Sequence, residues 1–192
     1  MKGTVPVTGN AEADELNATN PLALVISMLL DQQVPMEWAF FGPYLLQERM
    51  GGTLDAHAIA SMPEDEFLVV CRGPRAIHRF HGSMGRRVQA VCRVIVDEHD
   101  GDASRIWSEA KDGEDLQRRL LALPGFGPDK TRIFIALLAK RFGVRPEGWE
   151  TAAGPFADDT PRSVADIDSP ETLARVREWK QMMKKQGKTK AD

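Results

Sequence analysis

The residues best suited to chemistry in this 192-residue chain form a glycine-containing turn, PGFGP at residues 124–128. Gly125 and Gly127 allow positive φ angles and let backbone N–H groups approach a bulky partner closely. A pattern of apolar residues with helical spacing follows the turn, so these N–H groups lie at a helix start, where the helix dipole favours an anion. We therefore expect the turn to hold a nucleic-acid phosphate without reading a base.

The alternative for this segment is an ordinary hairpin of two helices. The charges around the turn favour phosphate binding, because the cations Lys130, Arg132, Lys140 and Arg141 follow it. Asp129 is the only acid among residues 116–145.

A second candidate binding segment is the cationic strip at residues 71–93. It carries six arginines, His78 and His81 and no acid, although the whole chain has a formal net charge of −3. A focused basic strip on an acidic body can bind phosphate locally. A solvated charged face is the alternative, and the neighbouring Gly-rich segment 82–85 favours binding.

The elements that must position these residues are predicted to be helices throughout. Asn20 can cap a helix with Pro21 in its first position, and the apolar residues up to Leu30 recur at helical spacing. A second helix begins at Pro35 and is broken or kinked at Gly42-Pro43. Ser61 and Glu64 are typical of a capping box before Phe67.

Further helices are expected over residues 85–99, from Ile106, over 115–123, after the turn, and over 173–185. No run of alternating apolar and polar residues is long enough to predict the strands of a sheet. The predicted fold class is therefore all-α. We divide the chain into a flexible N-terminus (1–18), one helical domain (19–185) and a basic disordered tail (186–192). Within the domain, the hairpin covers 115–142 and a loop covers 142–158.

Composition restricts the location of the protein and the cofactors that it could hold. The chain has no apolar run of the roughly 18 residues that a membrane span needs and no apolar signal core, so we expect a cytoplasmic protein. Cys71 and Cys92 are too few for an iron–sulfur cluster, which needs four thiolates. We expect no cofactor, no metal and a monomer.

The motif LPGFGP at residues 123–128 resembles the helix-hairpin-helix of the base-excision DNA glycosylases of the HhH-GPD superfamily. Residues 20–34 are similar to the helix that opens that fold and ends in a glutamine-bearing turn facing DNA, and residues 84–90 to the helix start before the hairpin. The order of motifs, over about residues 20–168, is closest to 3-methyladenine glycosylase II and endonuclease III-like proteins. The resemblance implies an all-α glycosylase-like domain and leaves room for a monovalent cation on hairpin carbonyls.

The resemblance also implies a catalytic aspartate beyond the hairpin, which stabilises the oxocarbenium-like sugar or activates water. The best match is Asp159, beside Asp158 and Thr160, if the segment 142–156 is an insertion. Asp166 is a rival, and a loop or helix cap is the alternative explanation for all three.

Members of the family that cleave the strand carry a lysine nucleophile at the seventh residue of the hairpin motif. Asp129 occupies that position here. Lys130 is one residue further, about 100° around the helix, so lyase chemistry is not expected.

At the end of the first apolar helix, Gln32 and Gln33 would form the wedge that faces DNA, although a surface turn explains them equally well. Trp38 is the candidate for stacking on a flipped base. The full set of expected DNA-contacting residues is Gln32, Gln33, Arg86, Arg87, Gly125, Phe126, Gly127, Lys130 and Arg132.

The resemblance implies a monofunctional DNA glycosylase that flips a damaged base out of double-stranded DNA and hydrolyses its N-glycosidic bond. The main alternative is a non-catalytic, structure-specific DNA-binding module that keeps the hairpin. A hairpin that binds a protein partner is the third class, and its association would be insensitive to salt.

Overall fold

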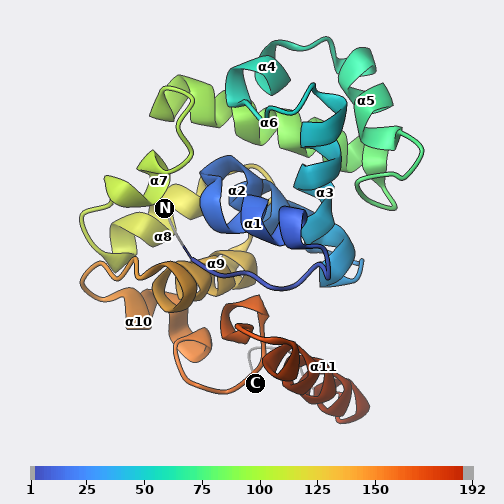
Figure 1. Ribbon diagram of the computed structural model, residues 1–192. Helices are drawn as coiled ribbons and strands as arrows, with labels where there is room; N and C mark the ends of the chain where they lie inside the picture. The colour runs from blue at the N-terminus through green and yellow to red at the C-terminus, as the bar shows by residue number, and fades with distance from the viewer. Residues whose placement is uncertain (1–2, 188–192) are drawn as a thin grey trace.

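The computed structural model describes residues 3–187, in which every regular element is a helix and there is no strand (Figure 1). The all-α prediction is therefore confirmed over the described part of the chain. The α-helices are α1 (Ala11–Thr19), α2 (Pro21–Leu30), α3 (Met36–Arg49), α4 (Ala56–Ser61), α5 (Glu64–Arg72), α6 (His81–His99), α7 (Arg105–Ser108), α8 (Gly113–Leu121), α9 (Pro128–Phe142), α10 (Trp149–Ala153) and α11 (Pro170–Lys185). Two 3₁₀ turns, Gly154–Phe156 and Val164–Asp166, lie between α10 and α11.

Helix α2 forms the centre of the fold, and every residue from Leu22 to Leu30 is buried. Its start matches the prediction, because the Asn20 side chain accepts a hydrogen bond from the Ala23 N–H and Pro21 occupies the first turn. Helices α1, α3 and α6 pack against α2, and in Figure 1 α4–α6 lie above it and α8–α11 below it. An apolar helix of this kind needs cover on every face.

The N-terminal segment differs from the predicted flexible tail. Residues 11–19 form α1, which packs against α2 and α3, and Val5 and Val7 are buried in the core. Asn17 is fully buried, and its amide donates to the Phe40 carbonyl at 2.8 Å. Between Gly3 and Thr19 the only large apolar residues are Val5, Val7 and Leu16, so the docking of this segment depends on α2 and α3, against which α1 packs.

Two helix positions differ from their predictions in part or in full. Helix α3 continues through Gly42 and Pro43, so the break that was one of the two predicted outcomes does not occur, and the kink stays a prediction. The expected capping box at Ser61 does not form: α5 begins after Pro63 without a side-chain cap, and the Ser61 hydroxyl donates to the His57 carbonyl.

The hairpin consists of α8, a turn over residues 122–127, and α9, whose residues Ile133 to Ala139 are all buried. The segment after α9, predicted as a loop over 142–158, contains α10 and a 3₁₀ turn, both of which pack on α9. Of the predicted tail 186–192, residues 188–192 lie outside the described range. No helix within residues 3–187 is long and apolar enough to cross a membrane.

Candidate nucleic-acid interface

The two glycines of the hairpin turn serve different purposes. Gly125 has φ +85°, and a Cβ there would lie 2.7 Å from Leu29 Cδ1. The predicted positive φ is therefore present at Gly125. At Gly127 it is not, because φ is −98°. A Cβ on Gly127 would meet open space, so nothing within the described chain requires glycine at this position.

Gly127 is the N-cap of α9 and supplies no side chain to the helix start. The first N–H groups of an α-helix have no partner within the helix. In α9 they open onto the surface at an exposed glycine, and the adjacent Asp129 is exposed as well. The geometry suits an approaching phosphate, apart from the carboxylate of Asp129, which pairs with Arg132 at 3.7 Å.

Two residues predicted to touch DNA are engaged inside the protein. The Phe126 ring is buried and lies 6.0 Å from the Phe134 ring, so it anchors the turn in the core. The Lys130 ammonium donates to the carbonyls of Met28 and Leu29, at 2.6 and 2.7 Å. Lys130 thereby binds the carboxyl end of α2, where the helix dipole favours a cation.

The glutamine turn after α2 presents its two glutamines differently. Gln32 is held inward: its amide donates to the Leu29 carbonyl at 2.9 Å, and its Oε1 accepts from Arg87 at 3.2 Å. Gln33 is exposed and has φ +55°, an uncommon conformation for a residue other than glycine. The turn therefore offers Gln33 to a partner.

Arg87, on α6, joins the glutamine turn to the hairpin turn. Its guanidinium binds Gln32, and its Cδ lies 3.5 Å from the position that a Cβ on Gly125 would take. Three segments far apart in the sequence are thus brought together, as the resemblance implied for residues 20–34, 84–90 and the hairpin.

Phe80 is a residue that the sequence reasoning missed. Its side chain is 45% exposed, and the Arg79 guanidinium lies 4.7 Å from its ring centre. It borders a pocket of about 310 Å³ whose other lining residues are Gln32, Gln33, His78, Ser83, Met84 and Arg87. An aromatic residue between cations in the strip 71–93 was the available signal, since such rings can stack on bases.

Trp38 lies behind this pocket rather than in its lining. Its indole N–H donates to the Ala76 carbonyl at 2.9 Å, and its ring centre is 6.5 Å from that of His78. The half-buried indole supports the loop that carries Phe80.

The six arginines of the cationic strip are all exposed, but they make different contacts. Arg86 pairs with Glu64 at 2.7 Å on the surface, and the Arg75 guanidinium lies 4.4 Å from the centre of the Phe41 ring. His78 is fully buried, so it adds no exposed charge. The exposed arginines of the strip are Arg72, Arg75, Arg79, Arg86, Arg87 and Arg93.

The candidate catalytic carboxylates lie elsewhere, beside the last turn of α9. Asp159 borders a pocket of about 280 Å³ together with Lys140, Arg141 and Arg145. Lys140 is twelve residues beyond Pro128, which corresponds to about 18 Å along the axis of α9. Asp159 and the hairpin turn are therefore at opposite ends of this helix.

The two neighbouring carboxylates are bound within the protein. Asp166 accepts from Lys140 Nζ at 2.6 Å and from the N–H groups of Arg162 and Ser163, and its side chain is 6% exposed. Asp158 pairs with Arg162 at 2.8 Å. The bond from the Ser163 N–H makes Asp166 part of a capping box at the 3₁₀ turn Val164–Asp166, and the ion pairs with Lys140 and Arg162 hold the segment after α9 in place.

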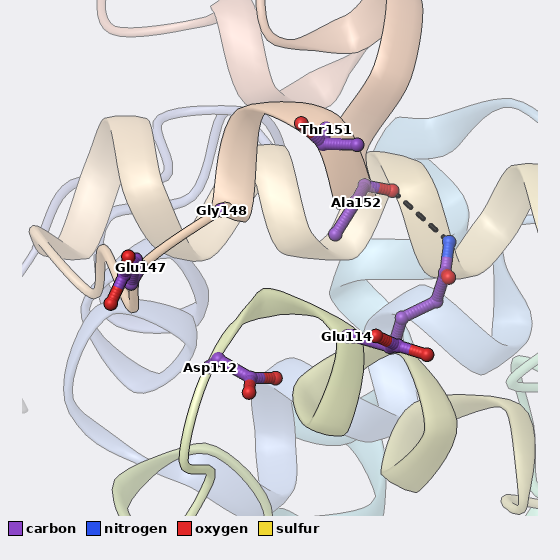
Figure 2. Close-up of a pocket in the computed structure, with 7 residues that line it drawn as sticks. Asp112, Glu114, Glu147, Gly148, Thr151 and Ala152 are labelled. Atoms are coloured by element: carbon purple, nitrogen blue, oxygen red, sulfur yellow. Dashed lines mark hydrogen bonds between the residues drawn. The ribbon is translucent and has the colours of Figure 1, made fainter.

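A pocket of about 590 Å³ lies between α8 and α10 and is lined by Asp112, Glu114 and Glu147 (Figure 2). The Gln117 amide donates to the Ala152 carbonyl at its edge, at 3.2 Å. Three carboxylates repel phosphate, so this pocket is not part of a nucleic-acid interface.

Metal ligands are not assembled within residues 3–187, which contain no group of three or more His, Cys, Asp or Glu residues arranged to hold a metal. Cys71 and Cys92 are buried free thiols. Burial raises the pKa of Cys71 to about 12, so it stays protonated and unreactive.

The chain is similar in structure to DNA-processing enzymes. It aligns with a trapped covalent intermediate of endonuclease III with DNA (17% identity, TM-score 0.46, 90% of this chain and 94% of that one). It also aligns with a non-covalent endonuclease III–DNA complex (19%, 0.47, 86% and 73%). A third similarity is to a thermostable thymine-DNA glycosylase (12%, 0.42, 72% and 59%).

The chain spans less than two thirds of the thymine-DNA glycosylase chain. No protein-family model matches the chain, and no curated protein matches it.

Proposed function

We propose that this protein binds double-stranded DNA and acts in base-excision repair as a DNA glycosylase. The observation that carries the proposal is the convergence of the hairpin turn and the glutamine turn on Arg87. Arg87 lies beside Gly125 of the hairpin turn and lines the same pocket as exposed Gln33 and Phe80, so we take the surface around Arg87 as the proposed DNA-binding face.

Each part of this face has a separate task on DNA. The hairpin turn contacts a phosphate through its backbone and so sets position without reading sequence. Gln33 can donate to and accept from an orphaned base, and Phe80 can stack on an unpaired one. A face of this kind selects DNA in which a base pair is weakened, because unstacking costs least there.

We propose that the glycosylase is monofunctional. Asp129 stands at the position of the family's lysine nucleophile, and the Lys130 ammonium is bound to the carbonyl groups at the end of α2. Asp159 remains our candidate for stabilising the sugar cation, with Asp158 beside it.

One observation favours a second function, a DNA-binding module without catalysis. Asp158, Asp159 and Asp166 lie beside the last turn of α9, about 18 Å along the helix from the turn that would hold phosphate. That spacing corresponds to about five base-pair steps of 3.4 Å. A carboxylate at that distance is too far away to act on the nucleotide that carries that phosphate.

The experiment that separates these functions is incubation of the protein with duplexes that each carry one lesion, including alkylated purines, uracil and mismatched thymine. Alkali-labile abasic sites without spontaneous strand cleavage would support the monofunctional glycosylase. Tight binding with no base released from any lesion would support the binding module. Failure to bind any duplex at low salt would exclude both.

A further inference from the structure

His78 lies in the loop before α6, is fully buried and connects two segments of the proposed DNA-binding face. Its Nδ1 accepts a hydrogen bond from the Phe80 backbone N–H at 3.0 Å. Its Nε2 lies 2.9 Å from the Gln32 carbonyl oxygen, which is 46 residues away in the sequence. The ring therefore links the glutamine turn directly to the loop that presents Phe80.

Only one protonation state of His78 satisfies both partners. A backbone N–H can only donate, so Nδ1 must carry no proton, and a carbonyl oxygen can only accept, so Nε2 must carry one. The neutral tautomer with its proton on Nε2 makes both bonds. The imidazolium would place an N–H group against the Phe80 N–H and break that bond.

We propose that His78 is a positioning residue. As the neutral Nε2–H tautomer, it fixes Gln33 and Phe80 in the relative positions that recognition of an unpaired base requires. Protonation of His78 breaks its bond to the Phe80 N–H, so Phe80 is no longer held beside the glutamine turn, although the bond from Nε2 to the Gln32 carbonyl persists. The consequence for DNA rests on the proposed function, whereas the positioning itself does not.

The surroundings of His78 oppose its protonation. Burial lowers its pKa from the usual 6.5, and the cations Lys130 of α9 and Arg79 of its own loop lower it further, against the Gln32 hydrogen bond, which raises it. Arg87 of α6 lines the adjacent pocket, and no acid is among that pocket's lining residues. Asp31, the C-cap of α2, is the acid nearest to the glutamine turn in sequence, and α3 contributes the neutral Trp38 ring.

The direction of the pH dependence follows from this lowered pKa. The folded protein binds fewer protons at His78 than the unfolded chain. The contribution of His78 to the free energy of unfolding is therefore fully present above pH 6.5 and is lost as the pH falls below it. The backbone N–H groups of the hairpin do not titrate in this range. Acid should therefore reduce selectivity for an unpaired base more than it reduces general binding to phosphate.

The first test needs no DNA. Imidazole nitrogen NMR of the full-length protein should show His78 protonated on Nε2 alone at neutral pH, with a midpoint below 6.5. The backbone amide signals of Gln33 and Phe80 should shift with that same midpoint. A His78 that is protonated on Nδ1, or amide signals that do not follow it, would overturn the proposal even if the protein proves to be a glycosylase.

The second test uses variants that do not titrate. In His78→Gln the amide nitrogen can take the place of Nε2 and donate to the Gln32 carbonyl. In His78→Asn the amide oxygen can take the place of Nδ1 and accept from the Phe80 N–H, so each variant keeps one of the two bonds. The readout is affinity for a duplex with an abasic site divided by affinity for the intact duplex, at about pH 5 and about pH 8. We expect the wild-type ratio to fall about tenfold at acid pH.

In both His78 variants the ratio should be the same at the two pH values. The control His57→Gln, an exposed histidine of α4 outside the cationic strip, should behave like wild type. A pH dependence that persists in His78→Gln would refute the role of His78. If the wild type binds neither duplex, the proposed function fails, and the NMR midpoints alone decide whether His78 positions the loop.

Discussion

Arg87 and Gln32 are joined across the proposed DNA-binding face, with the guanidinium of one donating to the side-chain oxygen of the other at 3.2 Å. The pair is exposed, so it contributes little to stability by itself. It does fix where both groups lie relative to the hairpin, because the stem of Arg87 packs beside Gly125. An arginine held in this way can meet phosphate without being ordered first.

Arg87→Gln should weaken binding to any duplex and reduce the dependence of log affinity on log salt by about one unit, because one phosphate contact is lost. Fluorescence anisotropy over a range of salt concentrations would measure this. Arg118→Gln is the matched control, since Arg118 is equally basic but lies beside the acidic pockets of α8. Equal slopes for wild type and Arg87→Gln would remove Arg87 from the interface.

The two hairpin glycines should respond differently to alanine. Gly125→Ala should lower the free energy of unfolding by about 1–2 kcal/mol, because its φ of +85° strains any residue with a Cβ. Gly127→Ala should cost less than about 1 kcal/mol, the effect of a poorer N-cap, but should reduce DNA affinity about tenfold by filling the space next to the phosphate. Chemical denaturation and DNA titration would separate the effects, and Gly127→Ala binding as well as wild type would argue against phosphate at this helix start.

Lys130→Met should destabilise the fold by about 2 kcal/mol, because the charged hydrogen bonds to the carbonyls of Met28 and Leu29 are lost. Arg132→Met is the control, because its pair with Asp129 is exposed and should be worth less than about 1 kcal/mol. Urea unfolding measures both. A Lys130→Met protein as stable as wild type would mean that this lysine does not hold α2 to the hairpin.

Phe80→Ala should leave stability nearly unchanged, because the ring is 45% exposed. It should reduce affinity for a duplex with an abasic site by about 1–3 kcal/mol, the usual value of one base–aromatic stack, and affect intact duplex much less. Val69→Ala on α5 is a control with an even more exposed side chain. Equal losses on both duplexes would indicate general packing rather than stacking on an unpaired base.

Asp159→Asn tests the chemistry. If Asp159 stabilises the sugar cation, the change should reduce base release by orders of magnitude and leave DNA binding intact or tighter. Borohydride should trap no covalent DNA adduct with the wild type. An adduct that disappears in Lys130→Ala would instead indicate a lysine nucleophile.

Asp166→Asn is the companion change, and it should act through stability. The substitution leaves the buried Lys140 ammonium without its carboxylate, a loss of about 3 kcal/mol. Thermal unfolding detects this directly. A stable Asp166→Asn protein with no base release would move the catalytic role from Asp159 to Asp166.

Local rules were sufficient for many of the helices. Asn20 followed by Pro21 marked the start of α2, and the spacing of apolar residues in α6 and α9 marked their buried faces. These features depend on residues within a few positions of one another, so the sequence alone determines them. The turn at Gly125 belongs with them, because few other residues tolerate its φ.

The tertiary structure decided which polar groups face outward. Two adjacent glutamines look alike in the sequence, yet Gln32 is bound by Arg87 while Gln33 is exposed, because only packing of α6 against α2 brings Arg87 there. Lys130 has the charge expected of a phosphate ligand. Its ammonium is instead bound by the open carbonyl groups at the end of α2, which lie about 100 residues earlier in the chain. Asp159 follows the hairpin in sequence but lies at the far end of α9, because the intervening segment folds back along that helix. Such outcomes depend on the distances between elements, and the residue types of a single segment do not carry that information.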